Sequence, residues 1–334
     1  MILLFVCLYS HFLQHSGFRL VASNDKAPAT HLFAGNFEGQ AAAAAAAAAG
    51  DESNNEHATG SDGSNNVYET TDSLNMYLGL HYPASGQGEG VAPILPHENT
   101  PIHALSFPQR VAQLVTKLEP RDKNRALDMG CSVGGSSFEL AKSFDNVDAF
   151  DFSNSFVDAA QRIQAGEKLR FKVPVEAELF EEVDVLLEPG TNPSTMSKVN
   201  FFVGDACDLD GMAADGRLSK DSYDGVVMAN LLCRLPDPLA CLNGLPNIVN
   251  KGGIVVMVTP FSWLTEYTPR SKWLGGFYDP VSKEAIRSKD VLKDVMDSNG
   301  FEKIHEEEMP LIIREHQRKY QYIVSEASGW RKVD

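Results

Sequence analysis

A glycine-containing loop lies between an apolar run and a helical pattern in the segment Ala126-Leu-Asp-Met-Gly-Cys-Ser-Val-Gly-Gly135. Gly130 and Gly134 have no Cβ atom, so the backbone there can approach a bound ligand closely. The helix that follows would offer free N–H groups at its N-terminus. The spacing from Asp128 to these glycines is D-x-G-x-x-x-G, which differs from the G-x-G-x-x-G motif of dinucleotide folds because position 132 is Ser. The loop therefore predicts a ligand site other than a dinucleotide site, although any tight strand-to-helix turn can use the same glycines.

Polar side chains also follow three further apolar runs, at the point where each run ends. Asp151 comes 21 positions after Gly130, and an acidic residue about 20 positions past the glycine loop reaches ribose hydroxyls in nucleotide-binding folds. Asp205 ends the third run and Asn230 ends the fourth. Open α/β sheets bind their ligands at the carboxyl ends of the strands, so the four runs predict one shared site. A lone Asp at a strand end is also a common helix cap, and this alternative stays open for Asp151.

Alternating strand and helix patterns must position these residues. Apolar strands are predicted at 125–131, 147–152, 199–204, 223–230 and 254–259, and helices at 68–80, 107–118, 137–144, 154–165, 238–249 and 288–299. This alternation predicts an α/β fold in which helices cover both faces of a parallel sheet. Two last strand patterns, at 301–306 and 319–324 with an apolar stretch at 311–313 between them, predict a closing antiparallel hairpin. Residues 167–198 are predicted to be irregular.

The first 66 residues are predicted to lie outside the fold. Residues 1–23 contain the apolar run Ile2–Tyr9, which is too short to span a membrane. No Lys or Arg precedes this run, so a secretory leader, a transit-type leader and a mis-called start codon stay open alternatives. Residues 24–66 combine the alanine run Ala41–Ala49 with a stretch rich in Gly, Ser and Asn, which predicts a disordered linker. The folded domain is therefore expected at 67–334.

The composition argues against several classes of partner. A formal net charge of −16 does not suit a nucleic-acid backbone, whose recognition depends on clustered Lys and Arg. The five cysteines are scattered and none shows C-x-x-C spacing, so neither a disulfide framework nor a metal site is expected. Free thiols near the predicted ligand loops favour a reducing, cytoplasmic location. No membrane partner is expected.

The glycine loop resembles the first motif of class I methyltransferases, which bind S-adenosylmethionine (SAM) on a Rossmann-like seven-stranded sheet. The two closing strands are typical of that sheet. A more specific resemblance covers residues 68–330 and is to the methyltransferase part of the ovothiol biosynthesis enzymes, the 4-mercaptohistidine N1-methyltransferases. It rests on the stretches DMGCSVGGSSFELAKSFDNVDAFDFS, FFVGDACDL, ANLLCRLPDP, TPFSWLTEYTPRSKWLGGF, MPLIIREHQRKYQYIVSEASGW and YETTDSLNMYLGLHY. The fourth stretch is more specific than the glycine loop, because generic methyltransferases lack it.

The resemblance implies SAM as the cofactor and assigns residues to its site. The strand ends and the glycine loop supply the expected cofactor-binding residues, which are Asp128, Gly130, Cys131, Gly134, Asp151, Phe152, Asp205, Ala206 and Asn230. Asp205 is expected to accept a hydrogen bond from the adenine amino group. Asn230 lies where this fold places the methyl donor beside its acceptor, so it is the candidate catalytic residue that orients the nucleophile. The N-terminal stretch would cover the cofactor, with Tyr77 and His81 closing over it.

The acceptor that the resemblance implies is 5-thiohistidine, also named 4-mercaptohistidine, methylated on an imidazole nitrogen. Its carboxylate needs a cationic partner, and the candidates are Arg270 and Arg314, because a guanidinium meets a carboxylate in bidentate fashion. Trp263, Tyr267 and Trp273 are the candidate walls of the acceptor pocket. Each of these residues has an ordinary alternative, as a surface cation or as an aromatic residue that packs the loop onto the sheet.

Full-length ovothiol enzymes also carry an iron-dependent sulfoxide synthase with an H-x-x-x-H-x-E ligand set. His11 and His15 have the first spacing, but position 17 is Gly. The chain is therefore expected to be a stand-alone methyltransferase whose small thiol-histidine substrate comes from a separate sulfoxide synthase. The alternatives are a class I methyltransferase for another small acceptor, a non-catalytic SAM-binding protein and, disfavoured by the missing middle glycine, an NAD-dependent oxidoreductase.

Overall fold

The computed structural model describes residues 67–83 and 101–333. The leader expected at 1–23 and the disordered linker expected at 24–66 lie outside the described residues. The residues from Val67 onward form one unit of contacts. Within the part of the chain that is described, no helix is long and apolar enough to cross a membrane.

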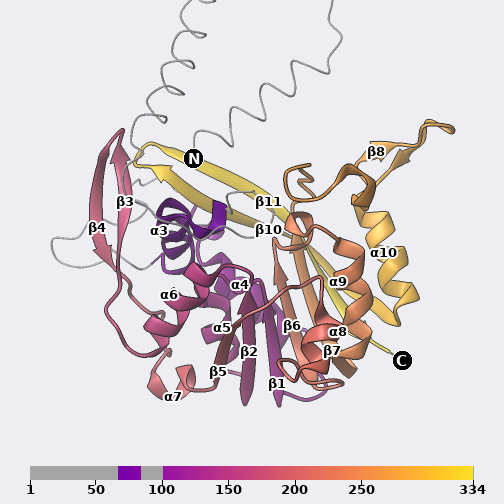
Figure 1. The fold of residues 1–334 in the computed structure, drawn as a ribbon, viewed down its shortest axis with the longest axis horizontal. Coiled ribbons are helices and arrows are strands. Elements are labelled where there is room, and N and C mark those ends of the chain that lie inside the picture. The colour runs from indigo at the N-terminus through magenta and orange to yellow at the C-terminus, as the bar shows by residue number, and fades with distance from the viewer. Residues whose placement is uncertain (1–66, 84–100, 334) are drawn as a thin grey trace, which may run out of the picture. The chain divides into compact units, whose positions relative to one another are not determined.

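A seven-stranded sheet forms the centre of the fold, in the order β10-β11-β7-β6-β1-β2-β5 (Figure 1). Its parallel strands are β1 (Arg125–Met129), β2 (Asn146–Asp151), β5 (Val199–Val203), β6 (Tyr223–Ala229) and β7 (Val249–Thr259). At one side, β11 (Lys319–Lys332) pairs antiparallel with β7, and β10 (Phe301–His316) pairs antiparallel with β11. The predicted Rossmann-like α/β fold with a seven-stranded sheet is therefore confirmed.

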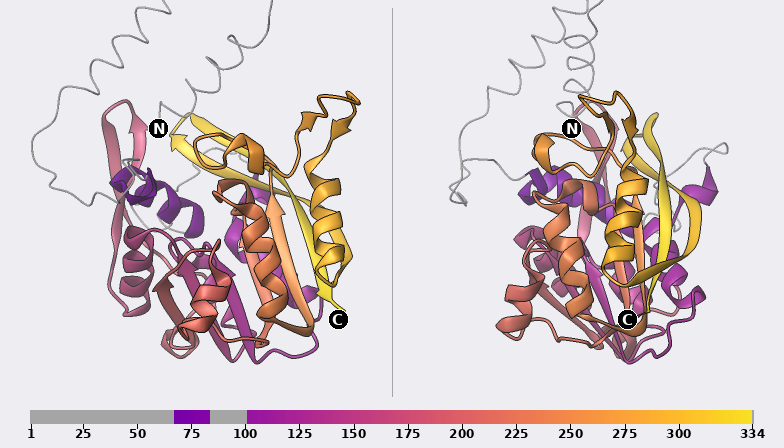
Figure 2. Two further views of the ribbon diagram at one scale, coloured as in Figure 1. Left: turned by 45° about the vertical axis from the view of Figure 1, so that its right-hand side comes forward. Right: turned by 90° about the vertical axis from the view of Figure 1, so that its right-hand side faces the viewer.

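Helices cover both faces of this sheet (Figure 2). One apolar cluster contains side chains from α3 (Thr71–His81), α4 (Phe107–Lys117), α5 (Gly135–Leu140), α6 (Asn154–Gln164) and α7 (Pro193–Met196). A second cluster contains side chains from α8 (Leu209–Ala214), α9 (Pro238–Gly244) and α10 (Ser288–Ser298). Within β1, Ala126 belongs to the first cluster, whereas Leu127 and Met129 belong to the second. Because neighbouring side chains of a strand point to opposite faces, the two clusters lie on the two sides of the sheet.

Short 3-10 helices connect these elements, namely η1 (Val67–Glu69), η2 (Ile102–Ala104), η3 (Leu232–Arg234), η4 (Leu245–Asn247) and η5 (Arg270–Lys272). The helix predicted over 238–249 ends at Gly244, and η4 follows it. Pro246, which has no N–H to donate, explains this early end. β7 consequently begins at Val249, five residues before the predicted strand.

The prediction that residues 167–198 are irregular is wrong. They contain a two-stranded hairpin of β3 (Arg170–Glu176) and β4 (Leu179–Asp184), which stands beside α3 and α6 at the left of Figure 1. Phe171 and Val173 are buried and alternate with exposed charged residues, which is the pattern of a half-buried strand. Pro174 and the many acidic residues of β4 obscure that alternation in the sequence.

The closing hairpin is confirmed, but it is longer than predicted. β10 has 16 residues and β11 has 14, paired from Phe301 with Lys332 to His316 with Lys319. Pro310 and the preceding glutamates interrupt the apolar pattern, yet β10 is the edge strand of the sheet, where proline and charge are tolerated. A smaller hairpin of β8 (Phe277–Tyr278) and β9 (Ala285–Ile286) lies between β7 and α10.

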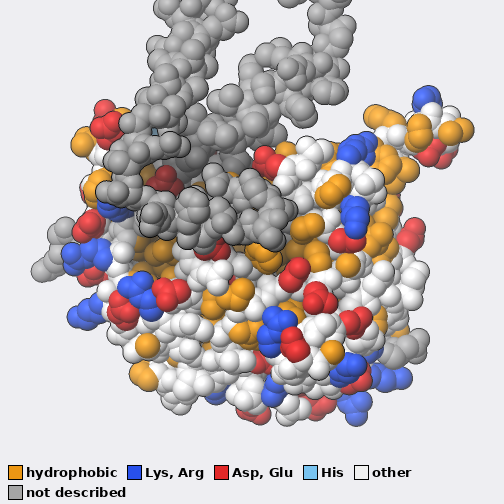
Figure 3. Space-filling model, in the orientation of Figure 1, with side chains coloured by type: hydrophobic (Ala, Val, Ile, Leu, Met, Phe, Trp, Pro, Cys, Tyr) orange, Lys and Arg blue, Asp and Glu red, His pale blue; other side chains and the backbone are white. Residues whose placement is uncertain are grey.

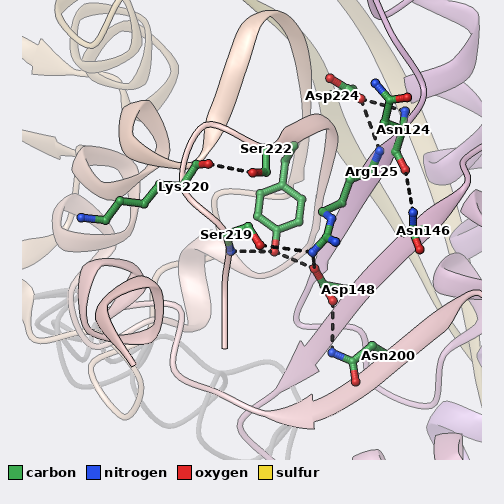
Figure 4. Close-up of polar contacts among 10 residues, drawn as sticks. Asn124, Arg125, Asn146, Asp148, Asn200, Ser219, Lys220, Ser222 and Asp224 are labelled. Carbon is green, nitrogen blue, oxygen red and sulfur yellow. Dashed lines mark hydrogen bonds and ion pairs between the residues drawn. The ribbon is translucent and has the colours of Figure 1, made fainter. Parts of the chain in front are cut away.

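Charged side chains are interspersed over the face drawn in Figure 3, but one group of polar residues joins four strands near their amino ends (Figure 4). The carboxylate of Asp148 in β2 accepts hydrogen bonds from Arg125 Nη1 of β1 (3.0 Å), Asn200 Nδ2 of β5 (3.1 Å) and Tyr223 Oη of β6 (2.8 Å). These contacts hold the four strands together at the edge opposite the glycine loop, so the loop edge stays available for a ligand.

The contact between Tyr223 and Asp148 gives a first prediction. Tyr223→Phe removes one hydrogen bond to a buried carboxylate, and we expect the free energy of unfolding to fall by about 1.5–3 kcal/mol in urea denaturation. Tyr278→Phe, at a side chain that is 74% exposed, is the matched control and should change little. Equal effects of the two variants would show that the contact does not stabilise the fold.

Candidate functional site

The glycine loop between β1 and α5 has the backbone shape that its glycines predict. Gly130 has a φ of 72° and Gly134 a φ of 85°, both in the left-handed region that favours glycine. A Cβ at Gly134 would lie 2.8 Å from Cζ of Phe201, and one at Gly130 would lie 3.0 Å from Cδ1 of Leu231. The backbone conformation therefore favours glycine at both positions, and the close approach of Phe201 adds a packing constraint at Gly134.

Asp128 and Cys131 lie behind this loop. Asp128 is 1% exposed, and its Oδ2 accepts hydrogen bonds from the hydroxyls of Ser136 and Ser137, each at 2.6 Å. Burial raises the pKa of Asp128 to about 6, although the two serine hydrogen bonds act in the opposite direction. The thiol of Cys131 is fully buried, and burial raises its pKa well above the usual value. The structure thus places both side chains where they support the loop from beneath.

Asp151, at the end of β2, joins the loop to the start of α6. Its Oδ2 accepts from the backbone N–H of Ser132 and its Oδ1 from that of Ser153, both at 2.9 Å. Burial raises the pKa of Asp151, and the two N–H groups oppose this change. The next residue, Phe152, is a large aromatic residue that is 65% exposed.

Asp205 and Ala206 follow β5, the next strand along this edge of the sheet. Asp205 is exposed and its Oδ1 accepts from the backbone N–H of Cys207 at 2.8 Å, while Ala206 is buried. The structure therefore brings the predicted residues of β1, β2 and β5 to one edge, as the strand order requires.

Asn230, directly after β6, has a strained backbone. Its φ of 52° lies in the left-handed region, which Asn tolerates better than most residues. Its N–H donates to the carbonyl of Val258 in β7 at 2.8 Å, and its Oδ1 accepts from the hydroxyl of Ser325 in β11 at 2.9 Å. Phe261, just past β7, has a φ of 49°. Such outliers persist at functional sites, where the surrounding structure holds them.

The segment η1–α3 lies over the glycine loop. His81 Nδ1 accepts a hydrogen bond from the backbone N–H of Gly135 at 3.0 Å, and the Tyr82 hydroxyl donates to the carbonyl of Val133 at 2.7 Å. At the other end of the segment, the Glu69 carboxylate accepts from the N–H groups of Asn154 (2.8 Å) and Ser155 (3.1 Å) at the start of α6. The segment therefore packs on the glycine loop and on the start of α6, and its expected role in covering the cofactor stays a prediction.

An aromatic cluster, which we call the tyrosine cluster, joins this segment to the loop after β7. It consists of Tyr68, Tyr77, Phe156, Tyr267 and the guanidinium of Arg234. Tyr68 has its ring centroid 6.1 Å from that of Phe156 and 6.1 Å from that of Tyr267. Arg234 Cζ lies 4.8 Å from the centroid of Tyr267. Of the residues predicted to bind the acceptor, Tyr267 is the member of this cluster.

The other predicted acceptor residues have partners elsewhere. Trp263 is buried and its indole N–H donates to the Ser288 hydroxyl at 2.8 Å, so it packs the loop onto α10. Trp273 donates to the carbonyl of Thr268 at 2.8 Å. Arg270 is exposed, and its Cζ lies 4.6 Å from the ring of Trp273 and 4.3 Å from that of Phe277.

The strands predicted at 301–306 and 319–324 would leave Arg314 in the connection between them. In the structure Arg314 instead lies within β10. Its Nη2 donates to the carbonyl of Pro174 in β3 at 2.8 Å, so it connects the two hairpins. The prediction misplaced it because the long β10 reads in the sequence as two separate pieces.

Two residues of the strand ends were missed by sequence reasoning. Arg234 follows β6 in the stretch ANLLCRLPDP, where its position five residues past the strand was the available signal. Ser325 carries no local signal, because only the sheet order brings it to Asn230. Within the described residues, no group of three or more His, Cys, Asp or Glu could hold a metal ion.

The serine contacts of Asp128 give a second prediction. Asp128→Ala leaves two buried hydroxyls without their acceptor, and we expect the free energy of unfolding to fall by about 2–5 kcal/mol. Asp128→Asn keeps an oxygen in the same place and should lose less than half as much. Urea denaturation of both variants measures the difference, and equal losses would contradict a loop-supporting role.

His81 gives a prediction about pH. Burial lowers the pKa of His81 from 6.5 to about 3, so the folded protein keeps it neutral while the unfolded chain is protonated below pH 6.5. The stability that this neutral imidazole contributes is present above pH 6.5 and is lost as the pH falls toward 3. We expect the stability advantage of wild type over His81→Gln to shrink by up to about 1.4 kcal/mol per pH unit between pH 6 and pH 4.

The comparison with His81→Gln is needed because Asp128 acts in the opposite direction. Its raised pKa makes the folded state bind more protons between about pH 4 and pH 6, so its contribution to stability grows as the pH falls there. Both proteins contain Asp128, so its contribution cancels in the difference. If the difference in free energy of unfolding between wild type and His81→Gln stays constant from pH 6 to pH 4, the prediction is contradicted.

Comparison with known proteins places this chain in a family. Residues 103–306 match the family described as methyltransferase domain. Similar solved structures include a SAM-dependent methyltransferase from Methanosarcina mazei, with 20% identity over 64% of this chain and 94% of that chain (TM-score 0.41). Magnesium protoporphyrin IX methyltransferase from Synechocystis, solved with bound SAM, has 17% identity over 66% and 78% of the two chains (TM-score 0.36).

A TehB-like SAM-dependent methyltransferase from Corynebacterium glutamicum has 15% identity over 66% of this chain and 86% of that chain (TM-score 0.37). None of the curated proteins compared with the chain matches it. The family match spans more than half of the 334 residues. The chain therefore belongs to the methyltransferase domain family and is a methyltransferase.

Proposed function

We propose that this methyltransferase transfers the methyl group of SAM to an imidazole nitrogen of 5-thiohistidine, the last step of ovothiol-type biosynthesis. The observation that carries the acceptor is the segment TPFSWLTEYTPRSKWLGGF, which resembles the ovothiol methyltransferases and which generic methyltransferases lack. In the structure this segment follows β7, and its Tyr267 joins the tyrosine cluster at the strand ends.

The residues at the strand ends fit SAM. Gly130 and Gly134 leave the loop backbone without Cβ atoms, and the exposed ring of Phe152 offers a flat apolar surface to adenine. The carboxylate of Asp151 accepts backbone N–H groups and has remaining lone-pair capacity for a ribose hydroxyl. Asp205 is exposed and supplies an acceptor for the adenine amino group. When bound there, SAM supplies an electrophilic methyl group on its sulfonium.

The task of the chain in this reaction is positioning. A neutral imidazole nitrogen attacks with its own lone pair, and the neighbouring thiolate adds electron density to the ring, so a strong general base is not required. Holding the two reactants in line supplies most of the acceleration that such a transfer needs. Asn230 is suited to orient the acceptor, because its Oδ1 is engaged by Ser325 and its amide N–H groups can donate to the thiolate.

The proposed acceptor already contains a carbon–sulfur bond. Its supply therefore requires a separate enzyme that forms this bond, and we infer a sulfoxide synthase as the source of the substrate.

A methyl-transfer assay tests the proposed acceptor. The full-length chain is incubated with SAM and 5-thiohistidine, and we expect a product heavier by one methyl group in mass spectrometry. Histidine is the matched control, because it lacks the electron-donating thiolate and should react far more slowly. SAM binding, measured separately by calorimetry, separates the two parts of the proposal. Clear SAM binding without methylated 5-thiohistidine would contradict the acceptor and direct the search to other imidazoles and thiols.

A further inference from the structure

Arg234 is held in a defined orientation at the strand ends. Its Nη1 donates to the carbonyl of Cys233 (3.0 Å) and to the carbonyl of Ser262 in the loop after β7 (2.9 Å). Its guanidinium lies over the ring of Tyr267. These contacts use one face and one nitrogen of the guanidinium, so the remaining N–H donors of its fork are available for a planar anion.

The positive charge of Arg234 has no carboxylate partner. Among the residues that the structure describes, Arg234 takes part in no ion pair. Its side chain is half-buried. A partly buried cation that faces no anion carries a desolvation cost, which a bound anion would offset.

The tyrosine cluster does not neutralise this charge. Burial raises the pKa of Tyr77 to about 12 and that of Tyr68 well above its usual value, so both phenols stay protonated near neutral pH. Neutral phenols donate hydrogen bonds, and the hydroxyls of Tyr68 and Tyr267 are hydrogen-bonded to each other beside the guanidinium. The guanidinium therefore keeps its positive charge beside neutral aromatic residues, and this environment is suited to a carboxylate.

The two arginines that the sequence indicated are less suited to this role. Arg270 is exposed and sandwiched by the rings of Trp273 and Phe277 within its own loop. Arg314 donates to the carbonyl of Pro174 on the hairpin of β3 and β4. Arg234 instead follows Asn230 by four positions and touches the loop that the generic fold lacks.

We propose that Arg234 binds the carboxylate of the amino-acid acceptor and so selects acceptors that carry one. This inference rests on the proposed function, because it takes the acceptor to be an α-amino acid. The hydrogen bond to the carbonyl of Ser262 assigns the guanidinium to the acceptor side, since Ser262 lies in the stretch that resembles the ovothiol methyltransferases. The methionine part of SAM has the same carboxylate chemistry, so the test has two arms.

The acceptor arm compares 5-thiohistidine with 5-thiohistamine, which lacks only the carboxylate. With Arg234→Gln in the full-length chain, we expect kcat/KM for 5-thiohistidine to fall about 10- to 100-fold, as for a lost charged hydrogen bond. The value for 5-thiohistamine should change less than threefold. Arg234→Lys keeps the charge and should recover part of the loss. Arg162→Gln, at an exposed ion pair on α6, is the matched control and should change neither value.

The cofactor arm measures binding of S-adenosylhomocysteine and of 5′-methylthioadenosine, which lacks the amino-acid part, by calorimetry. We expect Arg234→Gln to leave the ratio of the two affinities unchanged, and retained binding also shows that the variant is folded. A selective loss of S-adenosylhomocysteine affinity would assign Arg234 to the cofactor and overturn the proposal.

Two further outcomes separate the inference from the proposed function. In the first outcome, wild type methylates 5-thiohistidine, and the ratio of kcat/KM for 5-thiohistidine to kcat/KM for 5-thiohistamine is the same in wild type and in Arg234→Gln. The inference is then overturned and the proposed function stands. If wild type methylates neither compound, the proposed function fails and the inference fails with it.

Discussion

The site depends on one buried carboxylate that holds the glycine loop from beneath. Asp128 binds the hydroxyls of Ser136 and Ser137, which fixes the first turn of α5 against the end of β1. With the loop in this shape, the N–H of Ser132 reaches Asp151 and the N–H of Gly135 reaches His81. The contact of Asp151 in β2 with the loop and the contact of His81 in α3 with the loop therefore both depend on the hydrogen bonds of Asp128. Burying a carboxylate costs free energy unless hydrogen bonds compensate for the lost water. The loop therefore keeps its shape only while Asp128 keeps its hydrogen bonds to the two serines.

The positions of the proposed cofactor residues at one edge of the sheet could be predicted from the sequence, because each of these residues is local to a strand end. An apolar run identifies the strand, and the order of the runs brings Asp151, Asp205 and Asn230 to one edge. What the sequence does not contain is the direction of each side chain. Asp128 and Cys131 belong to the loop by position, yet the structure turns both side chains beneath it. Whether a residue of the loop touches the ligand or supports the backbone is decided by packing, which a single sequence does not specify.

The acceptor half could not be predicted in the same way, because its contacts are long-range. Asn230 and Ser325 are 95 positions apart, and the tyrosine cluster draws residues from η1, α3, α6, η3 and the loop after β7. The family resemblance suggested Arg270 and Trp263, because they lie in the stretch that generic methyltransferases lack. Their actual partners, the neighbouring rings for Arg270 and Ser288 for Trp263, are set by how that stretch folds on itself and on α10. The hairpin of β3 and β4 escaped prediction for a different reason, since charge and Pro174 hide its alternation.

The segment η1–α3 connects the two halves of the site. Its His81 contacts the glycine loop and its Glu69 contacts the start of α6, both on the cofactor side. Its Tyr68 has ring contacts with Phe156 of α6 and with Tyr267 of the loop after β7, which reaches the acceptor side. A displacement of this segment would break its contacts with the glycine loop, with the start of α6 and with the loop after β7 at once. In the proposed reaction, one segment then contacts the residues around both reactants, and holding the reactants in line supplies most of the acceleration that such a transfer needs.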